Sequence, residues 1–267
     1  MSKQTQHAGM LTSANAARLV LATAGLAAMA WAFVVFSVAA SESTISEVGN
    51  ALLRGEVFKS EVLASLDAHI NPDTSSGFRS ALLHQVVMIR LSRAEEATHS
   101  NDPMIIDQGL KSLSRILDQT LNNAPDDPFT WLVKFWCDGR RDGLRAGNFA
   151  YLRMSYELGP YESWISATRN PQALTAFPAL PSDLADRVVS EFAGFVKWRL
   201  DSEAAAIAAG PGRPIRSILF SRLAELDYGQ RRAFANTVYR MELDDVPVPG
   251  IAPPTPQIPM PVLPPNF

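Results

Sequence analysis

The sequence predicts an all-α protein with an N-terminal single transmembrane helix, an antiparallel helix-pair domain and a proline-rich tail. Three observations lead to this fold class. The run from Leu19 to Ala40 has no charged residue, 41–245 shows apolar side chains at helical spacing without an alternating β-branched run, and 247–267 holds nine prolines. We therefore expect a cytoplasmic N-terminus over 1–18, an anchor over 19–40, an exported helical domain over 41–245 and an extended, disordered tail over 246–267.

The predicted anchor is long enough to cross a bilayer. Its 22 residues would form a helix roughly 33 Å long, against a hydrocarbon core of about 30 Å. Lys3 and Arg18 precede it and no acidic residue does, which places the N-terminus in the cytoplasm and the bulk of the chain in the periplasm. A cleaved signal peptide is the alternative, with small residues at 38–40. The run exceeds the roughly 7–15 residues of a signal h-region, which favours a retained anchor.

Ala24, Ala28 and Ala32 recur every four residues within the predicted anchor. A row of small side chains lets a second membrane helix pack closely, so these alanines are our candidates for helix packing in the membrane. The alternative is that alanine is simply frequent in this segment.

Composition limits the partners and the compartment. The formal net charge is −3 and the pI about 5.8, so we expect no nucleic-acid partner. Cys137 is the single cysteine, which excludes an intramolecular disulfide and favours a bacterial envelope protein over an exported animal domain. Because it lies between Trp136 and Asp138, we expect Cys137 to be a packed apolar side chain rather than a reactive thiol.

Turn-forming residues divide the helical domain into successive elements. We expect helices over about 43–54, 58–69, 77–98 and 103–121, an aromatic helix from 129, an amphipathic helix after Pro181, and two shorter helices over about 215–226 and 229–241. The helix after Pro181 is the clearest, with Ser182 as its expected N-cap. Its apolar stripe consists of Leu184, Val188, Val189, Phe192, Phe195, Val196 and Leu200.

Large rings are concentrated between 128 and 164. Three of the five tryptophans (Trp131, Trp136 and Trp164) and three of the five tyrosines lie there. Because such rings bury on the order of 150–250 Å² each, we expect this segment to form the centre of the core. A carbohydrate-stacking platform is the alternative.

The junction from Pro125 to Trp131 resembles a tetratricopeptide repeat, in which a proline closes one helix pair and a large residue opens the next helix six positions later. Tyr151, Tyr156, Leu158 and Pro160 resemble the second half of such a repeat. The resemblance covers about 105–165 and implies paired antiparallel helices. The stretch 152–165 also resembles small anchored helical proteins of alphaproteobacterial envelopes, which implies a role in surface-polysaccharide assembly.

We expect no catalytic residue, cofactor or metal site. The sequence has no glycine-rich phosphate loop, GxSxG or HExxH, and His84 and His99 have no cysteine or third histidine to complete a zinc site. Acidic pairs at 95–96, 126–127 and 244–245 are adjacent in sequence, whereas glycosidase chemistry needs two carboxyl groups across a cleft. Asp126 and Asp127 are instead expected to cap the aromatic helix.

Two groups are our candidates for partner binding. The densest basic group would line a groove for an acidic peptide or anionic glycan, unless local Arg–Asp pairs account for it. The tail is an extended chain that loses little entropy on docking, unless it is an inert spacer. The residues concerned are Arg140, Arg141, Arg145 and Arg153 in the first group, and Pro253, Pro254 and Pro256 in the second.

These observations predict a non-enzymatic scaffold or accessory protein, held in the bacterial inner membrane by one helix. It would bind envelope protein partners in the periplasm, in polysaccharide assembly or export. Two alternatives stay open. One is a glycan-acting helical enzyme that uses the aromatic and arginine-rich region, and the other is a small subunit of a membrane complex held by its transmembrane helix.

Overall fold

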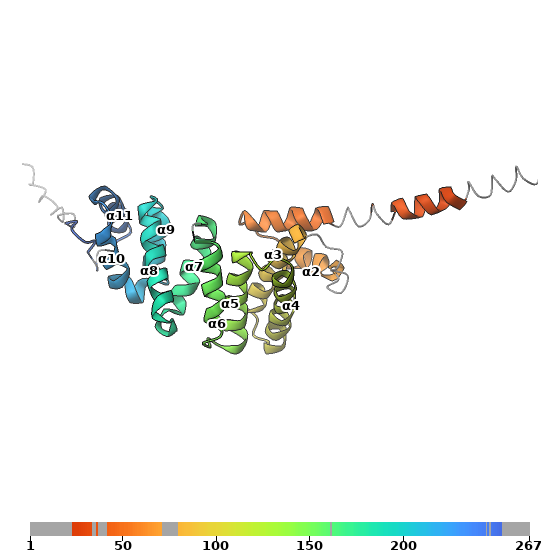
Figure 1. The fold of residues 1–267 in the computed structure, drawn as a ribbon, viewed down its shortest axis with the longest axis horizontal. Helices are drawn as coiled ribbons and strands as arrows, with labels where there is room; N and C mark the ends of the chain where they lie inside the picture. Colours follow the sequence, from red (N-terminus) through yellow and green to blue (C-terminus); the bar gives the residue numbers. More distant parts are fainter. Residues whose placement is uncertain are drawn as a thin grey trace, which may run out of the picture. The chain divides into compact units, whose positions relative to one another are not determined.

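The computed structural model describes residues 23–33, 36, 42–70, 80–160, 162–243, 245 and 247–252 (Figure 1). This described part is helical and contains no β-strand, so the predicted all-α class is confirmed. The chain divides into two compact units, Met1–Gly109 and Leu110–Phe267. Each is treated separately below.

The predicted anchor is described only at 23–33 and at 36, and its other residues lie outside the described part. Ala24, Ala28 and Ala32 fall on the helix over 23–33 and are exposed. None of the helices in the described residues combines the length and apolar character that a membrane crossing requires.

The first unit contains helices close to the expected ranges. A helix over 42–53 is followed by α2 (Ser60–His69) and α3 (Ser80–Ala97), and α4 (Pro103–Asn123) begins there. Gly55 closes the first helix with a left-handed φ of 82°, which glycine adopts without strain. The buried Arg90 on α3 donates to the Asp67 carboxylate of α2 at 2.9 Å and so ties these two helices together.

The second unit continues with helices α5 to α11. Short 3₁₀ turns follow α7 and flank α10. The helices are α5 (Pro128–Asp142), α6 (Asn148–Leu158), α7 (Ser163–Thr175), α8 (Ser182–Lys197), α9 (Asp201–Ala209), α10 (Arg216–Arg222) and α11 (Tyr228–Arg240), with the turns η2 (Phe177–Ala179), η3 (Arg213–Ile215) and η4 (Leu223–Glu225). Helix α8 packs against α7, α9, α10 and α11 and is therefore the centre of this half (Figure 1).

The aromatic segment forms a helical hairpin in which α5 and α6 lie along each other. As expected, Asp127 caps α5, accepting a hydrogen bond from the Phe129 amide at 3.0 Å. The Trp131 indole donates to the Pro125 carbonyl at 2.7 Å and its ring stacks on Tyr151, with centroids 5.8 Å apart. Cys137 is fully buried, which confirms that it packs as an apolar side chain, and burial raises the pKa of its thiol to about 12.

A second aromatic cluster lies outside the segment expected to form the core. Phe192 of α8, Phe220 of α10 and Phe234 of α11 are all fully buried. Phe234 meets the other two edge-on, with ring centroids 6.0 and 5.3 Å apart. The apolar stripe predicted for α8 therefore has its partners in the two last helices of the chain.

The expected N-cap of α8 is wrong, and the first described residues of the predicted tail are packed. Ser182 does not cap α8: the N-cap position is Pro181, and Ser182 is the first helical residue. The tail predicted from 246 is packed at its start, since Val248 is 1% exposed and the Pro249 carbonyl accepts from Arg231 at 2.5 Å. Val248 therefore packs into the core even though it lies between two prolines, because the chain here runs beside α11.

Replacement of Phe234 by alanine tests the second cluster. Phe234→Ala leaves a cavity beside two rings and should lower the free energy of unfolding by about 3–5 kcal/mol. Tyr228→Ala, a change at a 57% exposed ring on the same helix, is the matched control and should cost less than about 1 kcal/mol. Urea titration followed by circular dichroism measures both, and equal losses would contradict the packing described.

Candidate functional site

The candidate site is a cavity of about 1180 Å³ beside α8, which we call the α8 groove. It lies wholly within the second unit, between the α6–α7 junction, the C-terminal half of α8 and the segment joining α10 to α11. Its lining consists of Tyr156, Pro160, Ser163 and Ser166, then Arg187, Ser190, Glu191, Ala193, Gly194, Phe195, Lys197, Trp198 and Leu200, and finally Arg222, Glu225, Leu226, Asp227 and Gln230.

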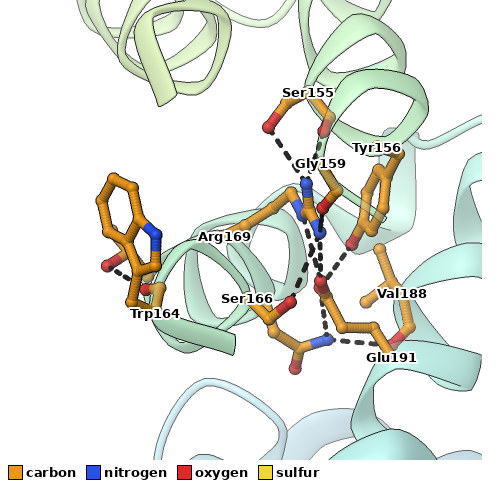
Figure 2. A network of polar contacts seen from close by, with 10 residues as sticks. Ser155, Tyr156, Gly159, Trp164, Ser166, Arg169, Val188 and Glu191 are labelled. Atoms are coloured by element: carbon orange, nitrogen blue, oxygen red, sulfur yellow. Dashed lines mark hydrogen bonds and ion pairs between the residues drawn. The ribbon is translucent and has the colours of Figure 1, made fainter. Parts of the chain in front are cut away.

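The floor of the groove is built around Arg169 of α7, whose side chain has no exposed surface. Figure 2 shows its guanidinium between three helices. It donates to the Ser155 carbonyl of α6 at 2.6 Å, to the Gly159 carbonyl at 3.0 Å and to one carboxylate oxygen of Glu191 on α8 at 2.6 and 3.0 Å. The Tyr156 ring covers the guanidinium, 4.1 Å from its carbon to the ring centroid. A buried charge is stable only when paired and hydrogen-bonded in this way.

Glu191 is satisfied on both oxygens. The oxygen that does not meet Arg169 accepts from the Tyr156 hydroxyl at 2.8 Å and from the Asn170 amide at 3.3 Å. Burial, followed by the negative charge of Glu191, raises the pKa of Tyr156 well above its ordinary value of 10.0. Tyr156 therefore stays a neutral hydrogen-bond donor. Helices α6, α7 and α8 are thus joined by a hydrogen-bond network. Tyr156 and Glu191 are already engaged in it, which leaves them little capacity for proton transfer.

The rim of the groove carries donors that no described residue uses. Trp198, just after α8, is 72% exposed, and the Lys197 ammonium lies 5.7 Å from its ring centroid. Arg187 and Ser190 form no hydrogen bond or ion pair with any described residue. The α8 groove thus combines a rigid, saturated floor with an open rim that has an indole and two cations available.

The other carboxylates of the groove have structural roles. Asp227 caps α11, accepting from the Gln230 amide at 2.8 Å in a reciprocal capping box. Glu225 pairs with Arg222 at 3.4 Å. In the described part of the chain no three His, Cys, Asp or Glu side chains gather as a metal site.

The four arginines singled out from the sequence do not line this groove. Arg153 pairs with Asp183 at 2.8 Å, Arg141 contacts Ser114 and Asp142, and Arg140 lies over the Trp136 ring. Arg145 is exposed in the α5–α6 loop. Pro253, Pro254 and Pro256 lie outside the described residues. These positions stay predictions for partner binding.

The groove is not evident from the sequence, although one signal points to its floor. Ile165, Arg169 and Ala173 recur every four residues and share the buried face of α7. A charged residue in the middle of an apolar stripe indicates a buried ion pair. No sequence pattern indicates that Trp198 lies on the rim, because this position depends on where α8 ends.

Substitution of Glu191 tests the floor. Glu191→Gln leaves the Arg169 charge buried without its counter-ion, and we expect a loss of about 3–5 kcal/mol in the free energy of unfolding. Glu157→Gln, at an exposed position of α6, should change it by less than about 0.5 kcal/mol. Similar values for the two variants in urea titrations would refute the proposed importance of the pair.

The pH dependence of stability tests Tyr156. Because the folded-state pKa lies above the unfolded value, its contribution is complete below about pH 10 and declines as the pH rises further. Tyr156→Phe should therefore be less stable at pH 8, yet lose less stability than the parent between pH 10 and 11.5. Parallel declines in urea titrations across this range would show that the hydroxyl does not titrate as described.

Comparison with known proteins supplies no family. No protein-family model, no curated protein and no solved structure matches this chain. The functional argument therefore depends on the chemistry of the α8 groove and on the sequence patterns outside it.

Proposed function

We propose that this chain is a membrane-anchored scaffold or accessory protein of the bacterial envelope that binds protein partners through the α8 groove. One observation carries the proposal. The rim offers an exposed indole with unpaired cations beside a fixed floor, which is the composition typical of energetically important contacts between proteins. Because the floor is already satisfied, a partner gains contacts on the rim without rearranging the three helices beneath.

The location is proposed from the sequence. The uncharged run Leu19–Ala40 and the basic residues before it support one membrane helix, with the helical domain in the periplasm. The resemblance of residues 125–160 to a tetratricopeptide repeat supports a role in protein contacts, and that of 152–165 supports envelope polysaccharide assembly or export as the setting. A subunit role through Ala24, Ala28 and Ala32 is compatible with this anchor.

A glycan ligand is the second candidate, because an exposed indole is also a surface on which sugar rings stack. Trp198 and the groove carboxylates favour it. Glycoside hydrolysis, however, requires two carboxyl groups free to act on the bond. Glu191, Glu225 and Asp227 are each engaged by Arg169, Arg222 or the α11 amides. We therefore propose a binding role and no hydrolytic activity.

Crosslinking in native membranes tests the proposal. Trp198→Ala removes the central contact of the rim and should reduce recovery of a crosslinked partner at least tenfold, since such interface tryptophans contribute about 2 kcal/mol or more. Tyr228→Ala removes an exposed ring that does not line the groove, and is the matched control. Both variants must show the parent's circular dichroism spectrum. Undiminished recovery with Trp198→Ala would refute the groove as the binding site.

A glycan-binding assay separates the two candidates. Envelope saccharide fragments should neither bind the full chain in a Trp198-dependent manner nor be shortened by it. Saccharide binding that is lost in Trp198→Ala and kept in Tyr228→Ala would replace the protein partner by a glycan.

A further inference from the structure

We propose that the α8 groove takes an extended proline-rich peptide and that its resident ligand is segment 253–267 of this same chain. The inference rests on the proposed function, because it names the chemistry of the ligand that the groove accepts. If segment 253–267 occupies the groove, an external partner must displace it in order to bind there.

The path of the chain supports this occupant. After α11, Asp245 forms an ion pair with Arg216, the first residue of α10. The chain then buries Val248 and places the Pro249 carbonyl 2.5 Å from the Arg231 guanidinium. Arg231 lies in the first turn of α11 and directly follows Gln230, which lines the groove. The last described residues thus contact Arg231, the neighbour in sequence of a groove-lining residue of α11.

At Gly250 the backbone passes close to the Arg231 side chain. Gly250 has a left-handed φ of 69°, and a Cβ there would lie 2.7 Å from the Arg231 guanidinium. The Ile251 amide donates to the Val248 carbonyl at 3.1 Å, which forms a turn before the chain continues. These contacts fix where segment 253–267 begins.

The remaining length suffices to fill the groove. Fifteen residues from Pro253 to Phe267 in a polyproline conformation extend over about 46 Å. A ligand tethered at the edge of its site has an effective concentration on the order of millimolar. Weak contacts are therefore enough to keep the groove occupied.

The chemistry of the two surfaces is complementary. Seven of the fifteen residues are prolines, which have carbonyl acceptors and no backbone N–H. The rim supplies donors of the matching kind, since the Trp198 indole, Lys197 and Arg187 donate to no described residue. The segment has no charged side chain of its own that would lose its hydration on docking. Aromatic rings beside donors are how proline-rich peptides are bound in general.

Cysteine crosslinking in the full chain tests the inference. We would combine Ser190→Cys, on the groove, with Met260→Cys, in the middle of the segment. The control pairs Met260→Cys with Ser217→Cys, an exposed position on α10 that does not line the groove and adjoins Arg216. Native Cys137 is fully buried and does not interfere. Mild oxidation followed by mass spectrometry of proteolytic fragments measures the intrachain disulfide.

We expect at least fivefold more intrachain disulfide in the groove pair than in the control pair. Trp198→Ala in the groove pair should bring the yield down to the control value, and excess synthetic peptide 253–267 should do the same. Equal yields in the two pairs would overturn the inference. A disulfide that forms only between chains, with a yield that rises with protein concentration, would overturn it in favour of a second copy as the occupant.

Partner recovery distinguishes failure of this inference from failure of the proposed function. If the crosslink stays at the control value while Trp198→Ala still abolishes partner recovery, the groove binds partners and the tail does not occupy it. If the crosslink forms but locking it leaves partner recovery unchanged, the tail occupies the groove and partners bind elsewhere. Tail occupancy together with reduced recovery after locking supports both.

Discussion

The buried guanidinium of Arg169 is the constraint on which the groove depends. A charge with no exposed surface is tolerated only where every N–H finds an acceptor, and here the acceptors come from the end of α6, from α7 and from α8. Each of these helices must therefore keep its position for the N–H groups of Arg169 to stay hydrogen-bonded. The pair contributes little net free energy by itself, but it penalises alternative packings of the three helices.

This arrangement separates the floor of the groove from its rim. Tyr156 and Glu191 face the groove and yet are fully used by Arg169 and Asn170. Trp198, just after α8, is largely exposed, and the Lys197 ammonium lies over its ring. A ligand thus meets floor side chains that the hydrogen-bond network already holds in place, and rim side chains that retain unused donors. Preorganisation of this kind favours binding, because less ordering is required at the moment of contact.

Helical periodicity predicted most of the fold. The stripe from Leu184 to Val196 and the cap at Asp127 lie as expected, since both depend on local spacing. Helix α9 was not predicted, because Asp201–Ala209 is mostly alanine and its faces do not differ in hydrophobicity. Glu191 lies beside the apolar stripe of α8. Its burial cannot be predicted from that position, because it depends on the ion pair with Arg169 of α7. Nothing in the sequence distinguishes Trp198 from the other aromatic residues, because tertiary contacts decide which rings stay exposed.

Hydrogen–deuterium exchange on the full chain, alone and with its crosslinked partner, tests the central claim most directly. The account predicts that partner binding slows amide exchange in 190–200 and 222–230 and leaves the α5–α6 hairpin unchanged. Slower exchange confined to 140–153, around the exposed arginines, with no change in 190–200, would contradict the assignment of the α8 groove as the binding surface.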